Sequence, residues 1–117
     1  MKALLILNDP PYGSERTYNG LRLAIALQKG TPAAELTVFL MADAVGAAKR
    51  GQKVPTGYYN VAAMLERVMA AHGRVLWCGT CMDARGLAAA DTIEGAARSS
   101  MSELAQATTD ADQVMVF

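Results

Sequence analysis

Two cysteines three residues apart are the side chains in this sequence best suited to covalent chemistry. Cys78 ends an apolar run and is followed by a Gly-Thr pair, which is typical of a buried strand entering a tight turn. Open α/β sheets carry out their chemistry at this end of their strands. Cys81 falls in the first turn of the next predicted helix, for which Thr80 and Asp83 have the spacing of an N-cap and an acidic third position. Backbone N–H groups there stabilise a thiolate, the reactive form of cysteine.

Three interpretations of this C-x-x-C pair stay open. The cysteines could be inert and buried, because free cysteine is among the most buried residue types. They could cycle between dithiol and disulfide, which would use both thiols equally. A persulfide relay instead needs one accessible thiolate of low pKa with cationic or N–H groups beside it. Arg85 could supply that charge, as could Arg50 in the basic loop 49–57, although that loop could equally be a solvated surface connection.

Other kinds of site fit the sequence less well. Structural zinc needs four ligands, whereas one chain offers two cysteines and the single His72. A Cys-His hydrolase would need His72 as its base, and no feature of the sequence places it near Cys78. The loop 8–15 lacks the glycine spacing of a dinucleotide-binding turn. All four prolines precede the cysteines, whereas thioredoxin-type proteins use a downstream proline. We therefore expect neither a metal nor a cofactor.

The composition limits the class of protein. The length of 117 residues fits a single domain, residues 1–117. Its 11 basic and 11 acidic residues leave no excess charge for neutralising phosphates, which argues against a nucleic-acid partner. No segment approaches the roughly 20 apolar residues of a membrane span, and the apolar run at 3–7 is too short for a signal peptide. We expect a cytoplasmic protein, with no membrane contact, whose thiols are kept reduced.

Apolar residues make up 52% of the chain but aromatic residues only 6%, and much of the remainder is alanine. A small domain this apolar often places part of its surface in a subunit interface. We therefore expect a homo-oligomer, although alanines on the surface could also account for the composition.

Alternating apolar segments predict the fold class. Continuous apolar runs, typical of strands covered on both faces, occupy 2–7, 36–41, 75–78 and 113–117. Between them the sequence predicts four helices. These are one across 18–27 capped by Ser14 or Thr17, a short one at 42–48, an amphipathic one at 61–69 ended by Gly73, and a last one capped by Ser100 with Glu103. This alternation predicts an α/β fold with a parallel sheet and helices on both faces.

Several of these segments together resemble the DsrE/DsrF-like family, and most closely its YchN-like branch. The matching segments are 11–15, 21–27, 39–45, 50–53 and Cys78-x-x-Cys81-x-Asp83-x-Arg85-Gly86. They cover nearly the whole chain in the expected order, and each is modest alone. The resemblance implies a three-layer flavodoxin-like or Rossmann-like sandwich with a mostly parallel sheet of about five strands. It also implies assembly into trimers or, more readily, hexamers.

The resemblance further implies a role in intracellular sulfur handling, in which persulfide sulfur passes from donor proteins to acceptor proteins. In relay members the carrier cysteine stands several residues before an Arg-Gly pair, and Cys78 occupies that place here. Cys81 is an extra thiol that could resolve a persulfide into a disulfide. Topology and resemblance add Asn8 and the loop residues Tyr12, Gly13, Ser14 and Glu15 to the pocket, although Ser14 could simply cap a helix. The alternatives are an oligomer that binds a small ligand without catalysis, and a dithiol redox protein.

Overall fold

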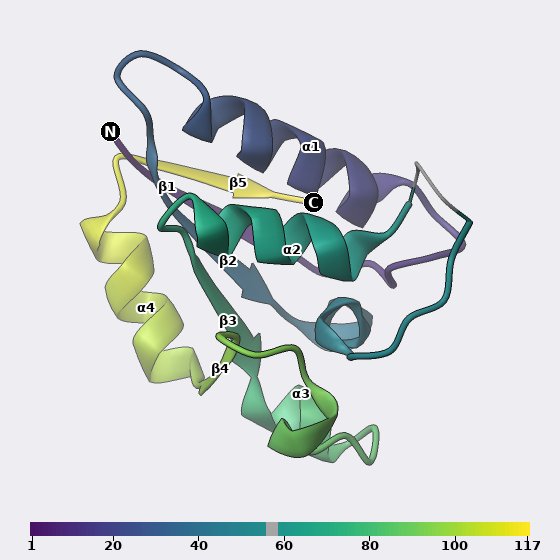
Figure 1. The fold of residues 1–117 in the computed structure, drawn as a ribbon. Coiled ribbons are helices and arrows are strands. Elements are labelled where there is room, and N and C mark those ends of the chain that lie inside the picture. The colour runs from purple at the N-terminus through teal and green to yellow at the C-terminus, as the bar shows by residue number, and fades with distance from the viewer. Residues whose placement is uncertain (56–58) are drawn as a thin grey trace.

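The computed structural model describes residues 1–55 and 59–117, in which strands alternate with helices (Figure 1). The strands are β1 (Lys2–Leu7), β2 (Glu35–Leu40), β3 (Arg74–Cys78), β4 (Ala97–Ser99) and β5 (Gln113–Val116). The α-helices are α1 (Arg16–Gln28), α2 (Val61–Ala70), α3 (Gly79–Asp83) and α4 (Met101–Asp110). Two 3₁₀ helices, η1 (Ala42–Ala48) and η2 (Ala89–Asp91), complete the chain.

The five strands form one parallel sheet in the order β4-β3-β2-β1-β5. The α/β fold with helices around a parallel sheet is confirmed, and β1 and η1 span the predicted residues. The sequence pattern did not reveal β4. This strand has only three residues, two of which are the polar Arg98 and Ser99, so it lacks the apolar run that marked the other strands.

The strand order determines which helices cover which face of the sheet. From β1 through β2 to β3 the chain moves in one direction, so right-handed crossovers place α1 and α2 on the same face. The return from β4 to β5 runs in the opposite direction and places α4 on the other face. At about 1.5 Å per residue, the ten residues of α4 span only about 15 Å. This second face of the sheet therefore has much thinner cover than the first.

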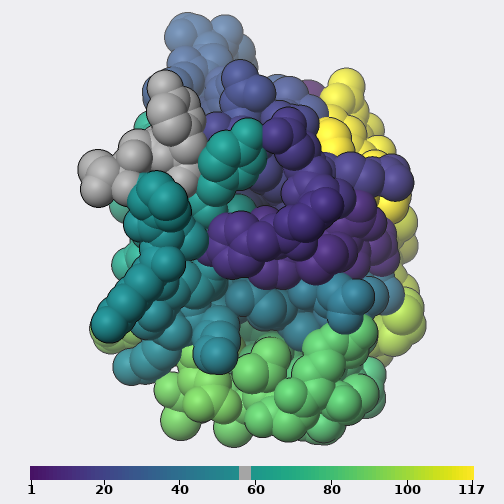
Figure 2. Space-filling view, turned by 90° about the vertical axis from the view of Figure 1, so that its right-hand side faces the viewer, coloured from purple at the N-terminus to yellow at the C-terminus, as the bar shows by residue number. Residues whose placement is uncertain are grey.

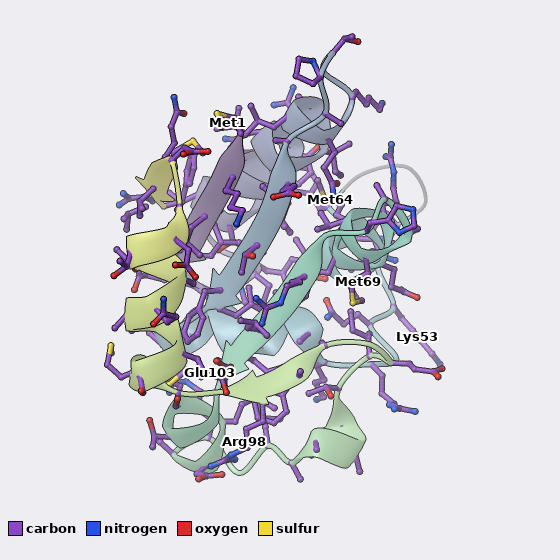
Figure 3. All side chains as sticks on the ribbon, turned by 90° about the vertical axis from the view of Figure 1, so that its left-hand side faces the viewer. Met1, Lys53, Met64, Met69, Arg98 and Glu103 are labelled. Carbon is purple, nitrogen blue, oxygen red and sulfur yellow. The ribbon has the colours of Figure 1, made fainter. Side chains whose placement is uncertain are left out.

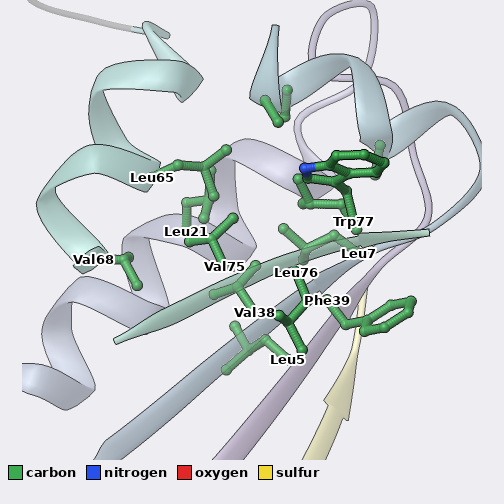
Figure 4. Packing of buried hydrophobic residues seen from close by; sticks show 14 of the residues in the cluster. Leu5, Leu7, Leu21, Val38, Phe39, Leu65, Val68, Val75, Leu76 and Trp77 are labelled. Carbon is green, nitrogen blue, oxygen red and sulfur yellow. The ribbon is translucent and has the colours of Figure 1, made fainter. Parts of the chain in front are cut away.

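Apolar side chains from the middle strands form the core beneath α1 and α2 (Figure 4). Successive strand residues point to opposite faces, so Val38 and Phe39 pack on different sides of β2, and both are buried. The buried residues labelled in Figure 4 are Leu5, Leu7, Leu21, Val38, Phe39, Leu65, Val68, Val75, Leu76 and Trp77.

The start of α1 differs from the sequence prediction. The helix begins at Arg16, with Glu15 at the N-cap and no side-chain cap. Ser14 donates to the Asp9 carboxylate at 2.9 Å, and Thr17 donates to the Asp9 carbonyl at 2.7 Å. The two hydroxyls that were expected to cap the helix instead tie the preceding loop together through Asp9, and Ser14 Oγ accepts only a long contact of 3.4 Å from the Arg16 N–H.

The end of α2 differs from the sequence prediction, and the start of α4 confirms it in part. After α2, the residue with positive φ is His72 (φ +69), not the expected Gly73. A Cβ on Gly73 would lie 2.6 Å from Val68 Cγ1 and 2.8 Å from the Val68 carbonyl oxygen, so this glycine permits a close approach. Ser100 caps α4 as predicted, accepting from the Glu103 N–H at 3.2 Å, whereas the Glu103 carboxylate accepts from the Ser99 hydroxyl.

Among residues 1–55 and 59–117, no helix combines the length and apolar character needed to cross a membrane.

Candidate functional site

Cys78 lies where β3 meets α3 and is itself the N-cap of that helix. Its Sγ accepts a hydrogen bond from the Cys81 backbone N–H at 3.3 Å, and the Thr80 hydroxyl lies 3.3 Å from the same sulfur. The side chain is 9% exposed. The helix begins at Gly79, so the expected cap, Thr80, lies within its first turn and contacts the sulfur that caps it.

The two thiols differ in acidity. Partial burial raises the pKa of Cys78, but hydrogen bonds from the side chains and backbone N–H groups of Cys81 and Thr80 outweigh it and hold that pKa below its ordinary value. Burial and the hydrogen bond to Cys78 raise the pKa of Cys81, against the lowering effects of the Ala42 N–H and the Arg85 charge. Because the thiolate is the nucleophile, this difference in pKa favours Cys78 over Cys81 as the nucleophile of the pair.

Segment η1 holds the other side of Cys81. The Ala42 N–H donates to Cys81 Sγ at 3.3 Å. Arg85, which follows α3, forms an ion pair with Asp43 at 2.9 Å and donates to the Cys81 carbonyl oxygen at 2.9 Å. The structure thus brings Cys78, Cys81 and Arg85 together as predicted, but Arg85 contacts the segment that carries Cys81, and its charge acts on the pKa of that thiol.

Arg98 is a residue of this site that the sequence analysis did not identify. It pairs with Trp77 in the β3–β4 register, and its guanidinium carbon lies 5.9 Å from the Trp77 ring centroid. It binds both carboxylate oxygens of Asp83 at 2.9 and 3.1 Å, beside α3 (Figure 3). A Cβ on Gly79 would lie 2.5 Å from this guanidinium. Asp83 is the main cause of the raised pKa of Arg98, and the negative charge of Cys78 adds to it.

Replacing Arg98 with glutamine is expected to weaken the thiolate character of Cys78. Removal of a nearby cation disfavours an anion, so the pKa of Cys78 should rise and its alkylation near pH 7 should slow by about threefold. Iodoacetamide labelling followed by peptide mass spectrometry across a pH series measures this. Arg85→Gln is the matched control, because it should shift the profile of Cys81 and leave that of Cys78 unchanged. An unchanged Cys78 profile in Arg98→Gln would contradict the assigned role.

The predicted loop residues contact other partners. Asn8 donates to the Phe117 carbonyl through its backbone N–H at 2.8 Å, Tyr12 bonds Gln52, and Glu15 accepts from Tyr59 at 2.7 Å. Ser14 is held by Asp9, as described above, and Gly13 adopts φ +96. Figure 2 shows this purple loop and the green cysteine-bearing segment on either side of the blue segment that contains η1. The described hydrogen bonds do not join the loop to the cysteines, and its part in the site stays a prediction.

Arg50 fastens its loop to the segment around η2. Its side chain donates twice to the Thr92 carbonyl, at 2.8 and 3.0 Å, and its backbone N–H donates to the Asp91 carbonyl. These bonds involve three of its donors, so Arg50 holds the start of the loop, residues 49–50, against residues 91–92. Residues 56 and 57 of the predicted basic loop lie outside the described part of the chain.

Comparison with known proteins identifies the family. The model of the DsrE/DsrF-like family matches residues 1–117, the whole chain. The chain belongs to the DsrE/DsrF-like family. It is 45% identical over 116 residues to the protein YchN of Escherichia coli, covering 99% of this chain and 98% of that protein, which supports the YchN-like branch. It is 36% identical over 118 residues to an uncharacterised protein of Methanocaldococcus jannaschii, covering all of both chains.

Solved structures agree with this DsrE/DsrF-like assignment. The crystal structure of YchN from Escherichia coli superposes with a TM-score of 0.93 at 44% identity, covering 100% of this chain and 99% of that chain. A protein of unknown function from Methanobacterium thermoautotrophicum superposes with a TM-score of 0.78 at 14% identity, covering 99% of this chain and 97% of that chain. The second likeness shows the shared fold alone.

Proposed function

We propose that this DsrE/DsrF-like protein carries sulfane sulfur as a persulfide on Cys78. The observation that carries the proposal is the position of the Cys78 sulfur at the N-cap of α3, where the N–H of Cys81 and the hydroxyl of Thr80 stabilise its anion. A carrier thiol must be a nucleophile before it is loaded and must hold a negative terminal sulfur afterwards. The hydrogen bonds from Cys81 and Thr80 support the first anion, and the effect of the Cys78 charge on the pKa of Arg98 indicates that this cation faces the same sulfur.

The proposed chemistry moves one sulfur atom without net oxidation. The Cys78 thiolate attacks the terminal sulfur of a donor persulfide, R–S–S⁻. A new S–S bond forms, the old S–S bond of the donor breaks, and the donor leaves as the thiolate R–S⁻. An acceptor thiolate then attacks the outer sulfur of the Cys78 persulfide and restores the Cys78 thiolate. Donor and acceptor are thiol-bearing molecules or proteins of a reducing, cytoplasmic environment.

Cys81 decides whether the protein is a carrier or a reductase. Attack of Cys81 on the inner sulfur of a Cys78 persulfide would form the Cys78–Cys81 disulfide and release hydrosulfide, and an external dithiol would then be needed to reset the pair. In the unloaded pair, burial and the hydrogen bond to Cys78 raise the pKa of Cys81, and burial, which does not depend on loading, keeps acting against the thiolate that this attack needs. The acidity of the two thiols therefore favours the carrier over the reductase.

The fate of the sulfur tests the carrier proposal. The full chain is loaded with polysulfide, freed of excess donor and mixed with glutathione, after which glutathione persulfide and sulfide are measured separately. Wild type and Cys81→Ser should both give glutathione persulfide, and Cys78→Ser should give none. Free sulfide with a protein disulfide in wild type, absent in Cys81→Ser, would instead establish the reductase. No transferred sulfur in any form would remove the proposal.

We also propose that the chain assembles with copies of itself, as a hexamer or a trimer. The thinly covered second face of the sheet ends at the edge strand β5, where Val114 and Val116 are 40% and 60% exposed, and Met101 at the start of α4 is 64% exposed. An exposed edge strand carrying apolar side chains is a ready template for association.

Replacing Val116 with aspartate should dissociate the assembly, because a charge would have to be buried in the interface. Light scattering coupled to size-exclusion chromatography should give an oligomer for wild type and a monomer for Val116→Asp. Glu66→Gln, which changes an exposed residue of α2, serves as the control and should remain oligomeric. A monomeric wild type would contradict the proposal.

A further inference from the structure

The outer faces of α1 and α2 form a groove of about 690 Å³ that the sulfur chemistry does not use. The two helices lie side by side and follow consecutive parallel strands (Figure 1). Ile25, Ala26, Ala63 and Met64 give the groove apolar walls. Ligand pockets in proteins commonly have volumes of about 300 to 1,000 Å³ and mostly apolar walls with a few polar groups. The groove fits this description in both size and lining.

The charged residues of the groove all have the same sign. Arg22, Lys29 and Arg67 line it, and the described lining includes no aspartate or glutamate. The chain as a whole has equal numbers of acidic and basic residues, so the groove is a local concentration of positive charge. The ion pairs within the described residues use Arg16, Arg85 and Arg98. The three cations of the groove thus have no carboxylate within ion-pair distance there, and they favour an anion.

One end of the groove carries aromatic rings. The ring centroids of Tyr18 and Tyr59 lie 4.3 Å apart, with a tilt of 33° between the ring planes. The Arg22 guanidinium carbon lies 5.7 Å from the Tyr18 centroid. Tyr59 is 42% exposed, and its hydroxyl is held by Glu15. Tyrosine faces and an arginine plane are the groups on which flat heterocycles stack.

The remaining cations lie farther along the two helices. Lys29 is eleven residues after Tyr18, which at 1.5 Å per residue is about 16 Å along the helix axis. The Gln28 side chain donates to the Val68 carbonyl at 3.0 Å, so the last turn of α1 lies against the last turns of α2. Lys29 and Arg67 therefore mark the far end of a groove that begins at the tyrosines. The groove therefore has two tyrosine rings with Arg22 at one end and the cations Lys29 and Arg67 at the other.

We propose that this groove binds a nucleotide, with the base against Tyr18 and Tyr59 and the phosphates toward Arg67 and Lys29. A nucleotide joins a flat heterocycle at one end to two or more negative charges at the other. The proposal goes beyond the sulfur function of Cys78, because no residue of the groove belongs to the site around the cysteines.

Calorimetric titration of the full chain with three probes tests whether the groove binds a nucleotide. ADP carries both recognition elements, adenosine only the ring, and pyrophosphate only the charge. ADP should bind at least about tenfold more tightly than either fragment, because it alone satisfies both ends of the groove. Equal affinity for pyrophosphate and ADP would show a simple anion patch and overturn the proposal. Failure of ADP to bind at millimolar concentration would also overturn the proposal. Binding of a glutamate-rich peptide without binding of ADP would overturn it as well.

Two arginine variants separate specific binding from general charge. Arg67→Gln should lower the affinity for ADP and for pyrophosphate by about tenfold, because a charge-assisted hydrogen bond is lost. It should leave the affinity for adenosine unchanged. Arg16→Gln removes an exposed arginine of α1 that lies outside the groove lining, and it should leave ADP affinity unchanged. An equal loss of ADP affinity in Arg67→Gln and Arg16→Gln would contradict the proposal. Cys78→Ser should bind ADP like wild type, so this result and the sulfur result are independent.

Discussion

In the Cys78→Ser variant, the fast thiol reaction of this protein is expected to disappear. Near pH 7 the lowered pKa of Cys78 makes it the more ionised of the two cysteines, whereas Cys81 is held mostly as the neutral thiol. Wild type should therefore show one fast and one slow alkylation with iodoacetamide. Cys78→Ser should retain only the slow reaction. A time course of intact masses measures both rates.

The two alkylation rates should depend on pH in different ranges. A thiolate forms as the pH rises through the pKa, so the fast rate should reach half its maximum below the ordinary pKa of cysteine. The slow rate should reach half its maximum above that value. Cys81→Ser is the matched control and should keep the fast reaction. If the fast reaction survives in Cys78→Ser and vanishes in Cys81→Ser, the roles assigned to the two thiols are reversed.

Replacing Phe39 with alanine is expected to cost about 3 to 5 kcal/mol of the free energy of unfolding. Phe39 is 1% exposed in the middle strand of the sheet, so the loss combines its transfer free energy with the cavity left behind. Because the chain contains 117 residues and one sheet, such a loss is a large share of its expected stability of about 5 to 15 kcal/mol. Urea unfolding followed by circular dichroism measures it.

Glu35→Ala provides a control on the same strand. Glu35 is exposed at the start of β2, so its replacement should change stability by no more than about 0.5 kcal/mol. Both variants are compared with wild type at one protein concentration, because self-association would otherwise shift the midpoints. A loss below about 1 kcal/mol in Phe39→Ala would contradict the role of this buried side chain in the core.

The apolar runs predicted most of the fold because parallel strands are buried on both faces. The run at 2–7 gave β1 its bounds, and the segment 42–48 is the predicted short helix. The three-residue β4 has no comparable run, and it forms because the neighbouring strand β3 offers a free edge. Helix caps were also hard to predict, because the positions of Ser14 and Thr17 depend on their bonds to Asp9, which only the folded loop brings within reach.

The candidate site was predictable to the extent that it is local in sequence. Cys78, Cys81 and Arg85 lie at the start of one short helix, within it and just after its end. Arg98 reaches Asp83 through the pairing of β3 with β4, a contact between residues fifteen positions apart that no local pattern encodes. The place of Asn8 depends on strand order, because β2 separates the strand that precedes Asn8 from the strand that ends in Cys78.

The persulfide on Cys78 is tested most directly by the mass of the full chain after brief exposure to polysulfide, followed by mapping of the modified peptide. We expect one added sulfur atom on the peptide that contains both cysteines, retained in Cys81→Ser and absent in Cys78→Ser. A sulfur atom that persists in Cys78→Ser would contradict the central role of this thiol. A wild-type mass that shows only the loss of two hydrogens would contradict the carrier.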